Sequence, residues 1–428
     1  MHITFIYPKI YWAKQTKWAW QNIMPLIYAR LKALTPEYFS CDFTDTRFEK
    51  IDYSKHTDIV VMSITTMGAK SAYEIADEYR KRGVKVVLGG IHVNLIPEEA
   101  KLHADSILIG EAELTYPQML QDAKNSCLKS VYRAESRYDF KDYKTDKSIY
   151  KGKHYFPIHF LETSRGCIFK CNFCSLAPMY NQKITYRDID NVIEEIKNTK
   201  EKFIAFSDEN LGNNIDRTIE LVKKLKHLKK MWMGQFSLNA LKNPEFVKLL
   251  KESHCFYVFI GFKTINEETL KAMNKTSNLG SLNKALENCV KYNLPIFCGY
   301  INGYSEETED EVWKAFEYAN SFQFINFMTN NLLPFPNTPV YNELNSQDRL
   351  ISEKWWLEDE FLYNHQPLFY NKNINPENLP SGIKLTQEYF KYKNIFKRFV
   401  KSRYNLSTRL LILIINIFSK YSFKAIGN

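Results

Sequence analysis

The first part of the chain alternates short apolar runs with amphipathic stretches. Runs rich in Val, Ile, Leu and aromatic residues predict strands at 2–7, 39–45, 58–64, 84–90 and 105–110. Helical spacing of apolar residues predicts helices between them, for example at 71–83 and 97–104. Several of these strands are apolar without polar alternation, which favours a parallel sheet covered on both faces. The pattern therefore predicts a doubly wound α/β domain, whose ligand site lies at the carboxyl ends of its strands.

A second, longer repetition follows the same pattern. Six apolar strands are predicted at 159–163, 202–207, 232–237, 255–262, 295–301 and 324–333. Amphipathic helices are predicted between them at 188–198, 215–228, 243–253, 280–293 and 308–322. Asn243 before Pro244 is a typical helix start, with a capping residue followed by a proline at the first helical position. Strand-and-helix units with right-handed crossovers predict a partial (β/α)6 TIM-like barrel with its active site at the carboxyl ends of the strands.

These repetitions divide the chain into four regions. We expect the doubly wound domain at 1–125, a polar and tyrosine-rich linker at 126–155, the barrel at 156–345, and a basic, mostly helical C-terminal region at 346–428. The apolar run at 410–418 is about half the length that a bilayer span needs, so no transmembrane helix is predicted there.

Composition narrows the class of protein. The chain has 428 residues, 45% hydrophobic and 25% charged, which is enough for two or three buried cores. The formal net charge is +10, but most of the excess lies from Lys384 onward, where ten Lys or Arg accompany one Glu. The rest of the chain is nearly neutral. No secretory signal is visible at the N-terminus, so we expect a cytoplasmic protein.

Three of the eight cysteines are clustered. Cys167, Cys171 and Cys174 have the spacing C-x3-C-x2-C in RGCIFKCNFCS and follow the first predicted barrel strand. Cysteines this sparse in a reducing compartment favour metal binding over disulfides. One interpretation is a zinc site closed by His154 or His159. The other is an iron–sulfur cluster with one iron left open, which fits the place where a barrel carries its chemistry.

The cysteine spacing, with Phe173 before the last cysteine and a six-unit barrel around it, resembles the radical S-adenosylmethionine superfamily. The resemblance implies that Cys167, Cys171 and Cys174 hold a [4Fe–4S] cluster. It further implies that S-adenosylmethionine binds the open iron through its amino and carboxylate groups. One electron, from a donor such as a flavodoxin or ferredoxin, would then release a 5′-deoxyadenosyl radical.

The same resemblance implies contacts with S-adenosylmethionine at the ends of later barrel strands. The candidates on the second, third and fifth strands are Ser207, Asp208, Glu209, Ser237, Asn239 and Asn302. The segment FSDEN stands where the superfamily receives the methionine amino group, although two adjacent acids at a strand end are also typical of a helix-capping turn. In GFKTIN, Lys263 occupies the place of a glutamate that is usual in the family.

The first domain resembles the flavodoxin-like cobalamin-binding domain that precedes the barrel in many radical S-adenosylmethionine enzymes. The resemblance rests on VVLGGIHVNLIPEEA and DSILIGEAELTYP. The implied cobalamin contacts at the strand ends are Thr65, Thr66, Gly89, Gly90, His92, Gly110 and Glu111. The loop after the first strand lacks the D-x-H-x-x-G motif of a lower cobalt ligand, and its Trp12, Trp18 and Trp20 could pack over the cofactor or in a helix core. A cobalamin-free scaffold domain is the alternative.

Residues 1–345 as a whole resemble the cobalamin-dependent radical S-adenosylmethionine enzymes, especially the branch that includes the hopanoid methylases. The resemblance implies methylation of an unactivated carbon in a small-molecule or lipid-like substrate. A radical enzyme that cyclises or rearranges its substrate shares every motif, so that alternative stays open.

The C-terminal tail mixes basic and aromatic residues. This pattern is compatible with a helix docked on the barrel, with peripheral contact to the inner face of an anionic membrane, or with single-stranded nucleic acid. A nucleic-acid-modifying enzyme that uses the tail is a third hypothesis. The lack of a dedicated RNA-binding module argues against it.

Overall fold

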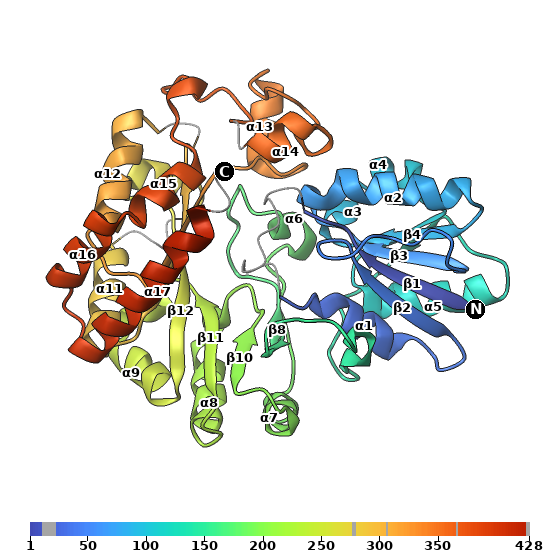
Figure 1. Cartoon of the computed structure of the whole chain (residues 1–428), viewed down its shortest axis with the longest axis horizontal. Helices are drawn as coiled ribbons and strands as arrows, with labels where there is room; N and C mark the ends of the chain where they lie inside the picture. Colours follow the sequence, from blue (N-terminus) through green and yellow to red (C-terminus); the bar gives the residue numbers. More distant parts are fainter. Residues whose placement is uncertain (11–22, 276–279, 305–306, 365–366, 425–428) are drawn as a thin grey trace. The chain divides into compact units, whose positions relative to one another are not determined.

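The computed structural model of the chain describes residues 1–10, 23–275, 280–304, 307–364 and 367–424. These residues form two compact units (Figure 1). The first unit comprises Met1–Phe156, Phe335–Thr338 and Lys354–Asn364, and the second comprises Pro157–Pro334, Pro339–Glu353 and His365–Asn428. The tryptophans that the sequence suggests for cobalamin packing, Trp12, Trp18 and Trp20, lie outside the described residues.

The first unit is built on a parallel sheet in the order β2-β1-β3-β4-β5-β6. Its strands are β1 (His2–Tyr7), β2 (Ser40–Asp45), β3 (Ile59–Ser63), β4 (Lys85–Gly89), β5 (Ser106–Ile109) and β6 (Val131–Arg133). The helices around it include α1 (Leu26–Leu34), α2 (Ala69–Lys81), α3 (Ile91–Leu95), α4 (Pro97–Leu102) and α5 (Ala112–Lys124). Figure 1 shows helices on both faces, and β3 and β5 are buried almost throughout. The predicted doubly wound α/β fold is confirmed.

The structure corrects the predicted surface linker at 126–155. This segment adds β6 to the sheet edge, in parallel with β5. Its aromatic residues then pack around Arg30 of α1, whose guanidinium lies 5.1 Å from the ring centre of Tyr138 and 4.7 Å from that of Tyr143. A strand of three residues is too short to show a period, so the sequence pattern does not reveal it.

The second unit is built on a parallel sheet in the order β14-β13-β12-β11-β10-β7. Its strands are β7 (Ile158–Leu161), β10 (Phe203–Phe206), β11 (Met231–Phe236), β12 (Cys255–Phe262), β13 (Ile296–Asn302) and β14 (Asn326–Asn331). The connecting helices are α7 (Ile189–Asn198), α8 (Ile215–Lys226), α9 (Pro244–Glu252), α10 (Glu267–Ala272), α11 (Leu282–Lys291) and α12 (Glu309–Asn320). The strand order follows the sequence, with β7 and β14 as the two edges, so the predicted six-unit partial barrel is confirmed.

Side-chain caps fix where the barrel helices begin. Asn243 accepts hydrogen bonds from the backbone N–H groups of Glu245 and Phe246, which confirms the predicted Asn-Pro start of α9. Asp188 and Asn214 cap α7 and α8 in a similar way. Such caps satisfy N–H groups that have no partner inside the helix. The helices therefore start at defined points after the loops that carry the site.

The C-terminal region is mostly helical, but it is divided between the two units. After α13 (Pro339–Ser346), the first unit gains the short helices η7 (Trp355–Leu357) and α14 (Asp359–Asn364). The second unit then gains α15 (Gly382–Tyr389), α16 (Tyr392–Lys401) and α17 (Leu406–Lys424). In the described part of the chain, no helix has the length and hydrophobicity that a membrane crossing needs.

Candidate active site

The three clustered cysteines lie in the loop that follows β7. A short antiparallel ladder closes this loop, formed by β8 (Ser164–Arg165) and β9 (Thr185–Tyr186). Gly166 opens the loop with a φ of +106°, and a Cβ there would collide with the carbonyl oxygen of Lys183. Farther along, the side-chain amide of Asn172 donates to the carbonyl oxygen of Ala272 at 2.7 Å. The loop is therefore held at its start and in its middle.

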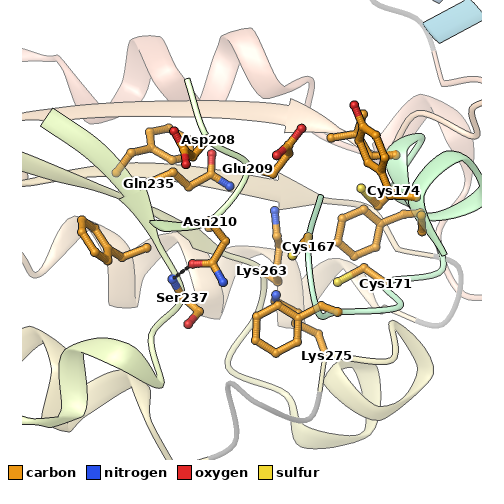
Figure 2. A pocket seen from close by; sticks show the side chains of 18 of the residues that line it. Cys167, Cys171, Cys174, Asp208, Glu209, Asn210, Gln235, Ser237, Lys263 and Lys275 are labelled. Carbon is orange, nitrogen blue, oxygen red and sulfur yellow. Dashed lines mark hydrogen bonds between the residues drawn. The ribbon is translucent and has the colours of Figure 1, made fainter. Parts of the chain in front are cut away.

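Cys167, Cys171 and Cys174 line one cavity of about 390 Å³ (Figure 2). Its wall also includes the ends of β10, β11 and β12, which is where a barrel of this type places its chemistry. The volume lies within the range of small-molecule sites, roughly 300–1,000 Å³. Five other predicted residues line the cavity: Phe173, Ser207, Asp208, Glu209 and Ser237.

The donor set fits an iron–sulfur cluster better than a single zinc ion. Among the described residues, no three His, Cys, Asp or Glu side chains are close enough together to hold one metal ion. His159, one of the two candidate zinc ligands, instead bonds Glu195 at 2.9 Å and Thr199 at 2.8 Å. Burial raises the pKa of Cys167 and of Cys174, so these thiolates need a positively charged centre to form. A multi-iron cluster spreads three thiolates around a wider centre than a single ion does.

The two adjacent acids after β10 have different surroundings. The carboxylate of Asp208 accepts hydrogen bonds from the N–H and hydroxyl of Thr163, at 2.9 and 2.7 Å, and from the hydroxyl of Ser164 at 2.6 Å. Glu209 accepts a hydrogen bond from the N–H of Gly166 at 3.0 Å. Burial raises the pKa of Glu209 to about 7. Glu209 can therefore exchange a proton near neutral pH, in the wall of the cavity.

Two of the predicted contacts with S-adenosylmethionine lie outside the wall of this cavity. Asn239 precedes the short helix η5 (Ala240–Lys242) and is not part of the cavity wall. Asn302 is fully buried, and its amide donates to the carbonyl oxygen of Pro380 at 2.8 Å. Asn302 therefore ties β13 to the segment before α15 rather than to a ligand in this cavity.

The wall also includes polar residues that are not among the predicted contacts, such as Asn210, Gln235, Lys263 and Lys275. The amide oxygen of Asn210 accepts a hydrogen bond from the N–H of Ser237 at 3.0 Å, which joins the ends of β10 and β11 (Figure 2). The amine of Lys263 lies 5.1 Å from the ring centre of Phe173, and burial lowers the pKa of Lys263 to about 8. A basic residue at the end of a barrel strand was the signal available for Lys263 in the sequence.

The predicted cobalamin residues gather at the carboxyl ends of β3, β4 and β5. They are Thr65, Thr66, Gly89, Gly90, His92, Gly110 and Glu111. A Cβ on Gly90 would collide with the backbone of Ile64, and one on Gly110 would lie 2.7 Å from the Cβ of Ala134. Both glycines also have positive φ, 98° and 90°. The close approach of neighbouring chain segments therefore requires glycine at these two positions, whether or not a ligand binds there.

Two of these residues are engaged within the protein. His92 is fully buried, with Nδ1 3.2 Å from the hydroxyl of Thr66 and Nε2 3.3 Å from Glu99. Glu111 is buried and accepts a hydrogen bond from Arg137 at 2.7 Å. The polar atoms of both side chains therefore already have partners within the protein. Through these partners they brace the sheet edge on which the other candidates lie.

Comparison with known proteins agrees with the two units. Residues 161–319 match the Radical SAM superfamily, and residues 35–120 match the B12 binding domain. The chain is 29% identical over 393 residues to bacteriochlorophyllide d C-12(1)-methyltransferase of Chlorobaculum tepidum, covering 88% of this chain and 84% of that protein. It is 31% identical over 368 residues to bacteriochlorophyllide d C-8(2)-methyltransferase of the same organism, covering 78% and 79%.

A solved structure shares the fold. It is the radical S-adenosylmethionine methyltransferase TsrM from Kitasatospora setae, with a TM-score of 0.66 and 14% identity over 81% of this chain and 76% of that one. At this identity the likeness is one of fold. The relative that is 31% identical over most of both chains, together with both matched domains, establishes the family. The chain belongs to the cobalamin-dependent radical S-adenosylmethionine methyltransferases.

Proposed function

We propose that this protein methylates a carbon atom of a tetrapyrrole-like substrate. The observation that carries the proposal is the cavity that Cys167, Cys171, Cys174, Glu209 and Lys263 line together at the strand ends of the barrel. Two relatives support the substrate class, since both are named for methylation of bacteriochlorophyllide d. A tetrapyrrole falls within the class of small-molecule or lipid-like substrates that the sequence resemblance implies.

In this proposal, different residues of the cavity hold the cluster and S-adenosylmethionine. Cys167, Cys171 and Cys174 supply three thiolates for a [4Fe–4S] cluster. Glu209 and Lys263 offer a carboxylate and an ammonium group to the amino and carboxylate groups of S-adenosylmethionine. When bound, the cluster with S-adenosylmethionine supplies the radical chemistry, and cobalamin supplies the methyl group. A flavodoxin or ferredoxin is the proposed electron donor.

In the first unit, the proposed cobalamin contacts narrow to Thr65, Gly89, Gly90 and Gly110. All four are partly exposed at the carboxyl ends of β3 to β5, whereas Thr66, His92 and Glu111 are buried. An added Cβ on Gly89 would make an ordinary van der Waals contact with Leu108 at 3.6 Å, so packing alone does not require glycine there. This edge is where a doubly wound sheet binds its ligand.

The first experiment measures cofactor content and products together. The protein is purified without oxygen from cells supplied with cobalamin, then reconstituted with iron and sulfide. We expect about four iron atoms and about one cobalt atom per chain. With a bacteriochlorophyllide-type tetrapyrrole, a reductant and methyl-labelled S-adenosylmethionine, we expect labelled product, S-adenosylhomocysteine and 5′-deoxyadenosine.

Two cysteine variants make this experiment decisive. Cys171→Ala should abolish formation of 5′-deoxyadenosine while cobalt content stays unchanged. The exposed Cys127 serves as a matched control, and Cys127→Ala should behave as the wild type. Full 5′-deoxyadenosine formation by Cys171→Ala would refute the cluster assignment. Formation of 5′-deoxyadenosine without S-adenosylhomocysteine would instead identify a radical enzyme that does not methylate.

A further inference from the structure

The last two helices form a hairpin on the barrel unit. Helices α16 and α17 run antiparallel, since the hydroxyl of Tyr392 lies 2.8 Å from that of Tyr421, and Arg409 donates to the carbonyl oxygen of Phe399 at 2.6 Å. Figure 1 shows the two red helices side by side. One face of this hairpin is packed against the barrel and the other faces solvent.

The packed face is tightly bound to the rest of the unit. Ile412 of α17 is completely buried, and the amide of Asn416 donates to the carbonyl oxygen of Ile325 at 2.9 Å. On α16, the guanidinium of Arg398 lies 3.4 Å from the ring centre of Tyr389. These contacts fix which residues of the hairpin point outward.

The outward face carries a continuous apolar stripe. We define the outer stripe as the following exposed residues: Tyr392, Phe396, Val400, Leu406, Leu410, Ile414, Phe418 and Tyr421. Within each helix they recur every three or four positions, which places them on one side. Twenty large apolar side chains are strongly exposed among the described residues, and these eight are all in one hairpin. Single exposed apolar residues are ordinary, but a concentration of this kind marks an interaction surface.

Basic residues border the outer stripe. Residues 389–424 contain nine Lys or Arg and no Asp or Glu. Lys393, Lys397 and Lys401 are exposed, and each directly follows a residue of the outer stripe on α16. An apolar helix face edged by cations is typical of helices that lie in the headgroup region of an anionic membrane.

We propose that the outer stripe docks on the surface of an anionic lipid bilayer, with α16 and α17 lying in the plane of the interface. The apolar side chains enter the boundary between headgroups and acyl chains, and the lysines meet lipid phosphate groups. A second copy of the chain fits this face less well, because a symmetric contact would bring two sets of like charges together. The proposal does not depend on methyl transfer, and it places the enzyme where apolar substrates collect.

Flotation with lipid vesicles tests the proposal on the full-length protein. We expect it to float with vesicles of phosphatidylcholine and phosphatidylserine, and much less with phosphatidylcholine alone. A variant with Phe396, Val400, Ile414 and Phe418 replaced by Gln should bind at least about tenfold more weakly. The matched control replaces exposed apolar residues elsewhere and should float as the wild type; its positions are Leu102, Leu114, Met231 and Trp313. Circular dichroism and iron content verify that both variants fold.

A charge variant and a measurement without lipid complete the test. Replacing Lys393, Lys397 and Lys401 by Gln should weaken binding to the anionic vesicles about 100-fold, at about fivefold per lysine. Equal flotation of the wild type and the stripe variant would overturn the proposal, as would equal binding to neutral and anionic vesicles. A lipid-free dimer that the stripe variant converts to a monomer, with no flotation of either, would assign the face to a second copy instead.

Discussion

Asp208 and Glu209 follow β10 side by side, yet their carboxylates differ in what they can still bind. Three hydrogen bonds from Thr163 and Ser164 tie Asp208 to the turn that precedes the cysteine loop. Glu209 bonds the N–H of Gly166, one residue before the first cysteine, and lines the cavity. Asp208 therefore shapes the loop, and Glu209 is the acid that we propose meets the cationic group of S-adenosylmethionine.

Glu209→Gln should remove a pH dependence from the binding of S-adenosylmethionine. With a pKa of about 7, Glu209 is protonated below neutral pH and ionised above it. An ionised carboxylate binds an ammonium group more strongly, so the affinity of the wild type should rise about tenfold between about pH 6 and pH 8. The affinity of Glu209→Gln should stay low and nearly flat. Equilibrium dialysis with the reconstituted protein measures both profiles.

Asp208→Asn is the control for this prediction. It should keep a rise in affinity with pH like that of the wild type, with the midpoint moved to somewhat lower pH, because the charge of Asp208 contributes to the raised pKa of Glu209. It should lower the free energy of unfolding by about 1–3 kcal/mol, because buried hydrogen-bond donors lose an acceptor. A flat profile in the wild type would contradict the role given to Glu209.

Lys263→Gln should weaken the binding of S-adenosylmethionine about 10- to 150-fold at pH 7. The reason is the loss of a charge-assisted hydrogen bond to the carboxylate, worth about 1.5–3 kcal/mol. Removal of this cation should also make the cluster harder to reduce, since a nearby positive charge stabilises the added electron. A redox titration followed by electron paramagnetic resonance measures the potential. Lys314→Gln, on the exposed side of α12, should change neither quantity, and an unchanged affinity in Lys263→Gln would contradict the assignment.

At the scale of elements, the sequence predicts a feature when the residue pattern that specifies it lies within one short continuous segment. The eight residues of β12, Cys255–Phe262, match the predicted strand because an apolar run of this length between two amphipathic helices is typical of a buried strand. The three residues of β6 carry no such pattern. The role of Asn210 was equally hidden, because its bond to Ser237 joins positions 27 residues apart. The cysteine spacing is local, so the sequence alone points to the three cysteines that line the cavity, but not to most of the rest of its wall.

Arg30→Met should loosen the segment that replaces the predicted linker. Arg30 is buried, forms an ion pair with Glu113 at 3.2 Å, and donates to the Tyr138 hydroxyl at 2.8 Å and the Lys144 carbonyl oxygen at 2.7 Å. Loss of one member of a buried ion pair costs about 3–5 kcal/mol. Urea unfolding should show that loss, and limited proteolysis should cut first within residues 134–146. Arg133→Met, at an exposed position, should change the stability by less than about 0.5 kcal/mol.

At the scale of the whole molecule, the two units are interleaved along the chain. Lys354–Asn364 follows the barrel in sequence but belongs to the first unit. There the indole N–H of Trp356 donates to Glu99 at 2.9 Å, and its ring centre lies 5.7 Å from that of His92. Burial disfavours the charged form of Glu99, but hydrogen bonds from His92, Trp356 and Lys354 outweigh it and lower the pKa of Glu99 to about 2. Nothing in the local pattern of WWLEDEF indicates which unit it joins.

Trp356→Ala should therefore damage the first unit selectively. Removal of a buried aromatic side chain costs about 3–5 kcal/mol, and it also leaves Glu99 without one of its donors. We expect cobalt content to fall while iron content stays near that of the wild type, as measured by metal analysis. Trp313→Ala, at an exposed position on α12, is the control and should leave both values unchanged. Equal loss of iron and cobalt in Trp356→Ala would contradict a selective effect.

Because residues 354–364 belong to the first unit, that unit can be completed only late in synthesis on the ribosome. When residue 156 has been added, all six strands of the first sheet have been made, but Trp356 is still about 200 residues away. At about 5–20 residues per second, the wait is about 10–40 s. Throughout that time the nascent first unit lacks the indole that covers His92 and Glu99. The first unit is thus completed only after the barrel strands have all been made, and until then its contact between His92 and Glu99 stays open to water.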